Sequence, residues 1–474
     1  MKSNTVVLAA LAAAILLTPA SCKLFDDINE LFDKDFLGPL GENQFYAQHM
    51  VTREPYKLTA KKLWEGDTCT IWAEEGSEVT YADAEKFADE YDTKIRTKLI
   101  DEFSVIDGEQ GFADILAYAD SLADSNGKLT ILFLDIQDGY DGSAYVAGYF
   151  FAADFYRQGK IPGYKSYSNG RDMIYVDTNP GLKNEKETYA NFAHELQHLI
   201  NYATRVRNGA GQMDTWVNEG LSAWAEYLYY EVNPPGKCND FINDVAGTIA
   251  QGNNFFVWGN HQGDSILDEY STVYLFFRWL YLQAKREGKE SGIFKKIIDS
   301  PSNNYQAVTE VAKDIDGNWE NWETLLGTWL AANYYPSNPF YGYIGDNELM
   351  NYIKVKPISE SSISLYPGEG VYSVIRNSFT PQTGGGSNIR YRGLVDDSSI
   401  ITASPITGNI LLTFNANTSN GKSVMPETGY LTGISDSSPA RAAAIGNSQA
   451  GRFTGPYVLD ARDLMGRDWE QEFP

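Results

Sequence analysis

The sequence predicts an α+β protein in which a strand-rich part is followed by a helical part and then by a second β-rich part. Apolar runs bounded by Gly- and Asp-rich turns are typical of strands, and they occupy residues 69–73, 128–136, 143–151 and 172–177. Apolar residues at helical spacing dominate four later segments, residues 185–206, 214–232, 270–285 and 319–334. From about residue 355 the chain alternates short apolar and polar runs.

Each part has elements that can be justified in order. Within the strand-rich part, residues 80–106 have amphipathic spacing and are expected to form a helix. The run at residues 128–136, KLTILFLDI, is largely apolar and indicates a buried strand. Near the C-terminus, short runs such as residues 370–375 and 410–414 alternate apolar and polar residues, and Gly, Ser, Asn and Pro lie between these runs. We therefore expect a separate, sandwich-like β-rich domain over residues 355–474.

Composition limits the classes of partner. The chain has 474 residues, which favours two or three domains, and 43% hydrophobic residues, enough for a substantial core. Its formal net charge is −25, and a field of that sign repels nucleic acid and anionic membrane surfaces. We therefore expect no nucleic-acid partner. The acidity is most simply a source of solubility, since the sequence has no calcium-loop pattern.

The first 22 residues resemble a bacterial lipoprotein signal. Lys2 precedes an apolar run at residues 6–17 that is too short to span a bilayer as a mature helix, and small residues lead to Cys22. Cys22 would then carry the lipid that anchors the protein to the cell envelope, at the outer membrane or cell surface. Cleavage after Ala20 and simple secretion is the competing interpretation. Both place the mature protein outside the cytoplasm, with residues 23–60 as a tether or pro-segment.

Two further cysteines follow, Cys69 and Cys238. In an oxidising compartment they could form one disulfide, and two buried free thiols are the alternative.

The segment AHELQHL at residues 193–199 carries the strongest chemical signal. His194 and His198 are four residues apart, so on a helix they lie on one face and can both reach one zinc ion. Glu195 lies beside them, where it can take a proton from water at the metal. The chain has only four histidines, so two ordinary surface histidines arranged around a glutamate by chance would be a rare coincidence. The pattern predicts a hydrolytic zinc site with one catalytic ion.

A hydrolytic zinc needs a third protein ligand and one open position. The position where a metzincin has its third histidine is occupied by Thr204, and only His49 and His261 remain as other histidines. Glu219, in the segment WVNEGLS, is the better candidate. It lies near the start of the next predicted helix, after a turn-forming NGAG segment at residues 208–211, so two antiparallel helices would bring it to the histidines.

Two nearby residues leave alternatives open. Asp214 or Thr215 can cap the helix that carries Glu219. Glu226, seven residues beyond Glu219 on the same face, either accepts a hydrogen bond from a ligand histidine or is an exposed helix glutamate.

HELQH followed by WVNEGLSAWAEYL resembles the gluzincin signature, HExxH with a downstream NEG glutamate. The second motif is similar to that of the aminopeptidase N family. Over residues 60–345 the wider setting, MIYVDTNPG, NFAHELQHLINY and YSTVYLFFRWL, more closely resembles the hyicolysin family of bacterial metallopeptidases. The exopeptidase motif of the aminopeptidases, of the G-x-M-E-N kind, is absent from the sequence, which favours endopeptidase action on protein or peptide substrates.

The resemblance implies zinc ligands His194, His198 and Glu219, with Glu195 as the catalytic base. It also implies a zincin-like domain over residues 61–345, with a mixed twisted sheet followed by active-site helices. In such folds an edge strand pairs with the substrate backbone, and residues 143–151 are our candidate for it. A tyrosine or histidine commonly stabilises the oxyanion in proteins that look like this clan. Tyr270 and Tyr274 are the candidates, with His261 as a third.

Two other functions compete with a peptidase. A lipid-anchored adhesin or binding protein could keep this fold with little catalysis, and the C-terminal β-rich domain would suit that role. An intact hydrolase could also act on a non-peptide amide. The presence of Glu195 beside all three predicted ligands favours catalysis, because a decayed enzyme has little reason to retain the base.

Overall fold

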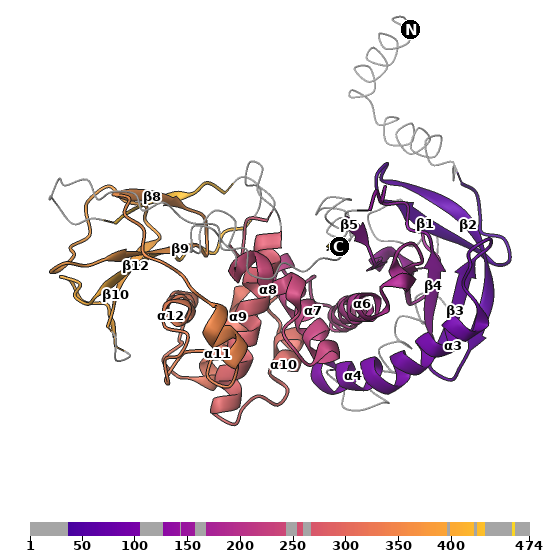
Figure 1. The fold of residues 1–474 in the computed structure, drawn as a ribbon, viewed down its shortest axis with the longest axis horizontal. Helices are drawn as coiled ribbons and strands as arrows, with labels where there is room; N and C mark the ends of the chain where they lie inside the picture. The colour runs from indigo at the N-terminus through magenta and orange to yellow at the C-terminus, as the bar shows by residue number, and fades with distance from the viewer. Residues whose placement is uncertain are drawn as a thin grey trace, which may run out of the picture.

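The computed structural model describes residues 37–104, 127–142, 144–156, 167–242, 254–258, 267–395, 399–420, 424–431 and 457–459. Figure 1 shows an elongated arrangement with a β-sheet at one end, a cluster of helices in the middle and the C-terminal strands at the opposite end. The order of strands, helices and strands agrees with the α+β class that the sequence predicts.

The first part is a six-stranded mixed sheet. In spatial order its strands are β1 (Gln44–His49), β2 (Glu54–Glu65), β3 (Cys69–Glu74), β4 (Leu129–Leu134), β7 (Met173–Asp177) and β6 (Gly148–Phe150). The central strands β3, β4 and β7 are parallel, whereas β1, β2 and β6 pair antiparallel with their neighbours. Every residue of β4 and β7 is buried, as their near-continuous apolar sequences require. The expected edge-strand segment supplies β6, which ends the sheet.

The sheet begins earlier than the sequence predicts. The sequence predicts a tether or pro-segment over residues 23–60, but residues 44–60 form β1 and much of β2, paired from Gln44 opposite Thr59 to His49 opposite Glu54. The sequence signal is weak because β2, EPYKLTAKKLWE, has few fully buried positions and carries lysines on its exposed face. The proposed signal segment and Cys22 lie outside the described residues.

The predicted helix at residues 80–106 forms one continuous helical run against the sheet. It consists of α3 (Tyr81–Glu90), a π-helical turn η1 (Tyr91–Arg96) and α4 (Thr97–Phe103). Thr80 and Asp83 form a capping box at its start. Phe87 makes edge-to-face contacts with Phe133 of the sheet and with Phe192 of the next long helix, so this run joins the sheet to the helical part.

The helical part follows a short segment that contains β5 (Ala144–Val146) and the 3-10 turns η2 (Ala152–Phe155) and η3 (Gly181–Lys183). The long helices are α6 (Glu185–Arg207), α7 (Thr215–Tyr230), α9 (Leu267–Arg286) and α12 (Trp322–Tyr334), which match the four predicted segments closely. Shorter helices lie between and after them, namely α8 (Pro235–Ile242), α10 (Ile293–Asp299), α11 (Tyr305–Ile315) and α13 (Asn347–Tyr352). None of the described helices is long and apolar enough to cross a membrane.

The C-terminal strands form two small ladders. One is a four-stranded antiparallel sheet in the order β11 (Ile400–Ile401), β10 (Ile389–Leu394), β12 (Ile410–Asn415) and β9 (Gly370–Val374), and the other pairs β8 (Ser362–Leu365) with β13 (Glu427–Tyr430). Leu365, Val371, Ile389 and Leu431 form an apolar cluster shared by the two ladders. A sandwich-like domain remains a prediction, because most of residues 432–474 lie outside the described part.

The C-terminal sheet packs against the helices instead of standing apart from them. The Tyr372 hydroxyl donates to the carbonyl oxygen of Leu330 in α12 at 2.7 Å, and Arg390 and Arg392 both pair with Glu323 at the start of that helix. A final short strand, β14 (Tyr457–Leu459), returns to the first part and pairs in parallel with β5. Cys69 and Cys238 are both buried free thiols, which decides between the two alternatives left open by the sequence.

Candidate metal centre

Helix α6 positions the two histidines as the spacing predicts. His194 and His198 are one turn apart, both are buried, and their ring centroids lie 4.7 Å apart. The stripe of Phe192, Leu196 and Leu199 is also buried, because α6 is covered on several sides. The imidazoles therefore lie in a solvent-poor interior and not on a solvated helix face.

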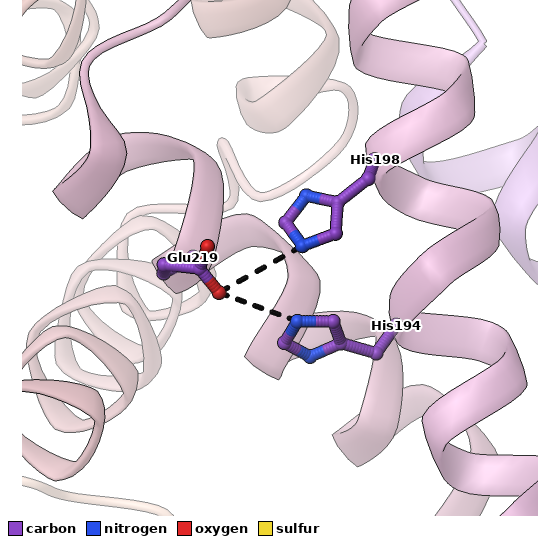
Figure 2. A group of neighbouring side chains, drawn as sticks. All are labelled: His194, His198 and Glu219. Carbon is purple, nitrogen blue, oxygen red and sulfur yellow. Dashed lines mark ion pairs between the residues drawn. The ribbon is translucent and has the colours of Figure 1, made fainter. Parts of the chain in front are cut away.

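Helix α7 brings the third donor. Helix α6 ends at Arg207, and Gly209 adopts a positive φ of 64° that reverses the chain, with the Ala210 N–H donating to the Arg205 carbonyl oxygen. The next helix then packs on α6 and places a Glu219 carboxylate oxygen 3.3 Å from Nε2 of His194 and 3.7 Å from Nε2 of His198 (Figure 2). Glu219 is completely buried.

The cap of α7 differs from the expectation. Asp214 occupies the N-cap position, but its side chain makes no capping hydrogen bond and accepts one from Asn420 at 3.4 Å instead. Burial raises the pKa of Asp214 to about 6, an effect that Asn420 partly opposes. The orientation of α7 therefore depends mainly on side-chain packing along its length.

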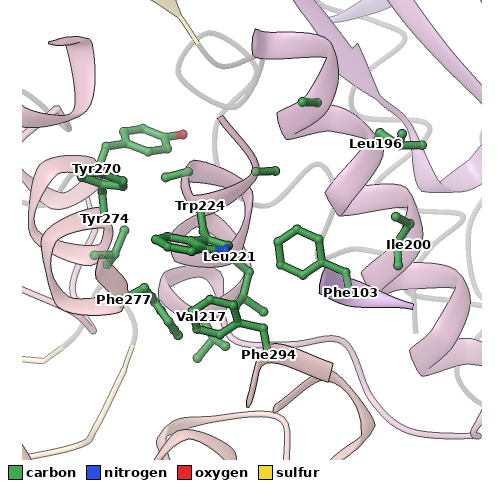
Figure 3. Close-up of a cluster of buried hydrophobic side chains, with 14 of the residues drawn as sticks. Phe103, Leu196, Ile200, Val217, Leu221, Trp224, Tyr270, Tyr274, Phe277 and Phe294 are labelled. Atoms are coloured by element: carbon green, nitrogen blue, oxygen red, sulfur yellow. The ribbon is translucent and has the colours of Figure 1, made fainter. Parts of the chain in front are cut away.

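That packing is dense and aromatic. Figure 3 shows Val217, Leu221 and Trp224 of α7 among side chains of α6 and α9. Gly220, directly after Glu219, has no side chain because a Cβ there would lie 2.2 Å from the Phe277 ring. The glycine of the NEG motif therefore lets α7 approach α9 closely, and this approach fixes the position of Glu219.

The imidazole of His194 is held by charge. Its Nδ1 is 2.7 Å from Oε1 of Glu226, and Nζ of Lys237 lies 3.3 Å from the same oxygen. Burial alone would raise the pKa of Glu226, but Lys237 and His194 together hold it below the ordinary value. An ionised Glu226 can only accept a hydrogen bond, so the proton sits on Nδ1 of His194 and Nε2 keeps its lone pair. Of the two roles left open for Glu226, the structure supports the hydrogen-bond acceptor.

The imidazole of His198 is held by neutral groups. Its Nδ1 is 2.9 Å from the Ser222 hydroxyl, which in turn donates to Oε1 of Gln197. Because that hydroxyl uses its proton on Gln197, it accepts the proton of Nδ1, and Nε2 of His198 also keeps its lone pair. Ser222 and Gln197 are both fully buried.

The donor set fits a zinc ion. The ligand atoms of His194, His198 and Glu219 all lie within 4.8 Å of one another, and both histidines hold their Nδ1 protons on partners that face away from the group. Two imidazole nitrogens and one carboxylate are the ligand types of catalytic zinc sites with an open fourth position. His49 does not join the group, since β1 is at the edge of the sheet opposite β6.

Glu195 is held between α6 and the edge strand. Its Oε2 accepts a hydrogen bond of 3.0 Å from the Phe150 backbone N–H, and its Oε1 accepts one of 3.4 Å from Asn191. The close approach requires Gly148, because a Cβ there would lie 2.8 Å from the Asn191 side chain and 2.6 Å from the Tyr175 carbonyl oxygen. The carboxylate is thus beside the ligand helix and aimed at the sheet edge.

The structure separates the two tyrosine candidates. Tyr274 is fully buried, and its hydroxyl donates to Oδ1 of Asn233 at 2.6 Å. This hydroxyl is therefore committed to the core, which argues against an oxyanion role that helix periodicity alone could not exclude. The Tyr270 ring packs on Trp258 and lies 4.3 Å below Nζ of Lys237, the residue that also contacts Glu226. His261 lies outside the described residues.

Sequence reasoning missed Ser222, Gln197 and Lys237. Ser222 is three residues after Glu219 and Gln197 directly precedes His198, so helical spacing could have placed both near the ligands. Lys237 carries no such signal, because it reaches Glu226 from α8, after the turn at residues 231–234.

Comparison with known proteins agrees with this geometry. The chain is 28% identical over 333 residues to the neutral metalloprotease ShpI of Staphylococcus hyicus, an alignment that covers 68% of this chain and 69% of that protein. No family model matches the chain. The similarity supports a metallopeptidase, and the cluster of His194, His198 and Glu219 points to a metal ion of the zinc type.

Proposed function

We propose that the protein is a zinc-dependent endopeptidase that hydrolyses peptide bonds in protein or peptide substrates. The observation that carries the proposal is the convergence of His194, His198 and Glu219 from two packed helices, with Glu195 one position from the first ligand. The similarity to a neutral metalloprotease supports the same reaction class.

A zinc ion in this site supplies Lewis acidity, which acidifies water and polarises a peptide carbonyl. His194 and His198 would hold the ion through Nε2, because their Nδ1 atoms contact Glu226 and Ser222. Glu195 accepts a proton from the attacking water on its carboxylate and then delivers this proton to the amine that leaves. Its hydrogen bond from Phe150 keeps that carboxylate in place between turnovers.

The substrate backbone would lie along β6. This strand pairs with β7 on one side and ends the order of described strands on the other. The Phe150 N–H, which donates to Glu195, marks the side of β6 that faces the ligand helix. An extended peptide that adds to this edge would bring its carbonyl group beside both Glu195 and the metal ligands.

A second donor to the oxyanion would come from the helical side. Of the two predicted tyrosines, Tyr270 is the better candidate for this donor, since the Tyr274 hydroxyl donates to Asn233. Its ring is in contact with Lys237, which connects it to the side of the centre that holds His194.

We also propose an extracytoplasmic location. The N-terminal segment ending at Cys22 supports export and lipid attachment to the cell envelope, and simple secretion is the other outcome. Mass spectrometry of the mature N-terminus distinguishes the two, because lipidation adds acyl chains to Cys22 and secretion leaves a chain that begins after Ala20.

The test uses protein that starts at Lys23, in the parent form and as Glu195→Gln. We expect about one zinc per chain in both, and cleavage of unfolded casein by the parent only, lost after chelation and restored by zinc. The glutamine keeps the shape of Glu195 but cannot take a proton, so it separates catalysis from metal binding. Zinc-loaded parent protein that leaves casein and unfolded peptides intact would contradict the proposal.

A further inference from the structure

A pocket opens directly beside the metal centre. Its lining includes Phe150 from the edge strand, His198 from the ligand helix and Asn218, the neighbour of Glu219. The pocket therefore borders both the strand along which the substrate is expected to bind and the proposed metal ligands. Together with the solvent at its open mouth, the space between its lining residues is about 350 Å³.

One part of the wall of this pocket is apolar, and the rest is polar. Phe150 comes from the edge strand β6, Ala152 from the turn η2, Tyr202 from α6 and Met213 from the loop between α6 and α7. Phe150 and Tyr202 pack with ring centroids 5.9 Å apart, and the Tyr202 hydroxyl is 3.0 Å from that of Tyr156. Such walls suit the methylene groups of a long side chain.

A buried cation lies in the same pocket. Arg205 lines it, yet only 1% of the residue is exposed. Its Nε donates to the Gly211 carbonyl oxygen at 2.9 Å. Its Nη1 donates to the carbonyl oxygens of Ile298 near the end of α10 and of Ser302 after it, both at 3.2 Å. The other terminal nitrogen, Nη2, has no hydrogen-bond partner among the described residues.

The charge of Arg205 has no ionised partner close by. Its hydrogen bonds go to neutral carbonyl groups, and within the described part of the chain no carboxylate oxygen lies within ion-pair distance of it. Burial lowers the pKa of Arg205, and Asp299 opposes this only from a distance. A guanidinium that has lost water and has no counter-ion gains more from a carboxylate ligand than from a neutral one.

We propose that this pocket binds a carboxylate of the substrate next to the scissile bond, with Arg205 as the residue that selects it. The inference rests on the proposed peptidase function and adds a substrate class to it. The apolar part of the wall favours an acidic side chain with methylene groups to bury, above all glutamate. A free C-terminal carboxylate of a peptide offers the same chemistry, and the experiment separates the two sources.

The first measurement needs no variant. Three internally quenched peptides share one sequence, are blocked at both ends and carry Glu, Gln or Leu at each position flanking the scissile bond in turn. We expect kcat/KM for the Glu peptide to exceed that for the isosteric Gln peptide by about tenfold or more, because a charge-assisted hydrogen bond replaces a neutral one. If Glu and Gln peptides are cleaved equally at every position, the pocket does not select a carboxylate and the proposal is wrong.

A fourth peptide tests the alternative source. It ends in a free carboxylate one residue after the scissile bond, and its amidated twin is the control. Preference for the free acid without any preference for internal Glu would assign Arg205 to a chain terminus and contradict the side-chain proposal. Failure to cleave any of the peptides, by protein that holds zinc, would instead contradict the proposed function itself.

Variants then assign the preference to Arg205. We expect the Glu-to-Gln ratio of kcat/KM to fall toward one in Arg205→Gln and to be partly kept in Arg205→Lys, which retains the charge. Arg207→Gln removes an exposed arginine two residues away and should leave the ratio unchanged. Zinc content and the thermal midpoint report on folding of each variant. An unchanged ratio in folded Arg205→Gln would show that another group selects the carboxylate.

Discussion

The two imidazoles of the metal centre are anchored by different chemistry. In the first half of the centre, which we define by His194, the imidazole contacts the anionic Glu226, and Lys237 of α8 balances the charge of that carboxylate. In the second half, defined by His198, the imidazole contacts the Ser222 hydroxyl, which donates a hydrogen bond to the neutral side chain of Gln197. Both arrangements fix the same tautomer, but only the first adds negative charge beside a ligand. The difference predicts that the first half contributes more to metal affinity than the second.

The largest expected effect comes from neutralising the charged half. Glu226→Gln keeps the size of the side chain but leaves Lys237 without its carboxylate partner next to the site. We expect zinc affinity to fall by about 100-fold, the upper end of the usual range for such partners. Competition with a chelating dye measures it, and Glu231→Gln, at the exposed end of the same helix, is the matched control. An affinity equal to that of the parent would remove the distinction between the halves.

Gly220→Ala should disturb both halves together. The new Cβ would meet the Phe277 ring, so α7 must shift relative to α9 and carry Glu219 away from the histidines. We expect about 2 kcal/mol of lost stability in chemical denaturation, together with weaker zinc binding. Gly236 is also helical but has open space at its Cβ position, so Gly236→Ala should lose none of this stability. Equal stability of the two variants would show that α7 is not held by close packing at Gly220.

A half-buried carboxyl, that of Glu102 in α4, sharpens the contrast with Glu226. Burial raises the pKa of Glu102 to about 7, and Trp224 and Lys295 only partly oppose this. The folded state therefore holds the proton of Glu102 more tightly than the unfolded chain, and this stabilisation is lost as pH rises from about 4.5 to 7.

Glu102→Gln should remove that loss. Between pH 5 and pH 8 we expect the variant to gain about 2–3 kcal/mol of stability relative to the parent, measured by urea denaturation at each pH. The difference should be small at pH 5, where the parent carboxyl is protonated in the folded state. A constant difference across the range would mean that Glu102 is ionised in the folded protein throughout.

The smallest effect should come from the neutral half. Ser222→Ala removes the acceptor of the His198 proton and leaves a buried N–H and the Gln197 oxygen without this hydroxyl. We expect zinc affinity to fall by about tenfold, the lower end of the range for such partners. If Ser222→Ala lost more zinc affinity than Glu226→Gln in the same dye competition, the His198 half would contribute more to metal binding than the His194 half, contrary to our prediction.

The contrast between the halves also marks what sequence reasoning could reach. His194, His198 and Glu195 follow from helical periodicity within one segment, and Glu219 needs only a short reversal between two helices. Lys237 lies on a helix that packs back after an irregular turn, so no local pattern places it. Helical spacing places Tyr274 on one face of α9, but its hydroxyl donates to Asn233. Spacing shows which residues share a helix face, and it does not show which residues of other elements contact that face.

The same limit applies to the fold. Strands β4 and β7 were predictable because burial on both faces demands continuous apolar sequence. Strand β2 was not predicted because few of its residues are fully buried, and its lysines resemble those of a solvated tether. Sequence patterns therefore report burial most clearly, and half-exposed strands at the margin of a sheet least clearly.

The most direct test of the account is a crystal structure of zinc-loaded protein with anomalous data above and below the zinc absorption edge. We predict one peak within about 2.0–2.2 Å of Nε2 of His194, Nε2 of His198 and a Glu219 carboxylate oxygen. Glu226 and Ser222 should keep their contacts to the two Nδ1 atoms. A folded protein with no peak at this position, or with Glu219 turned away from the ion, would contradict the assignment of the centre.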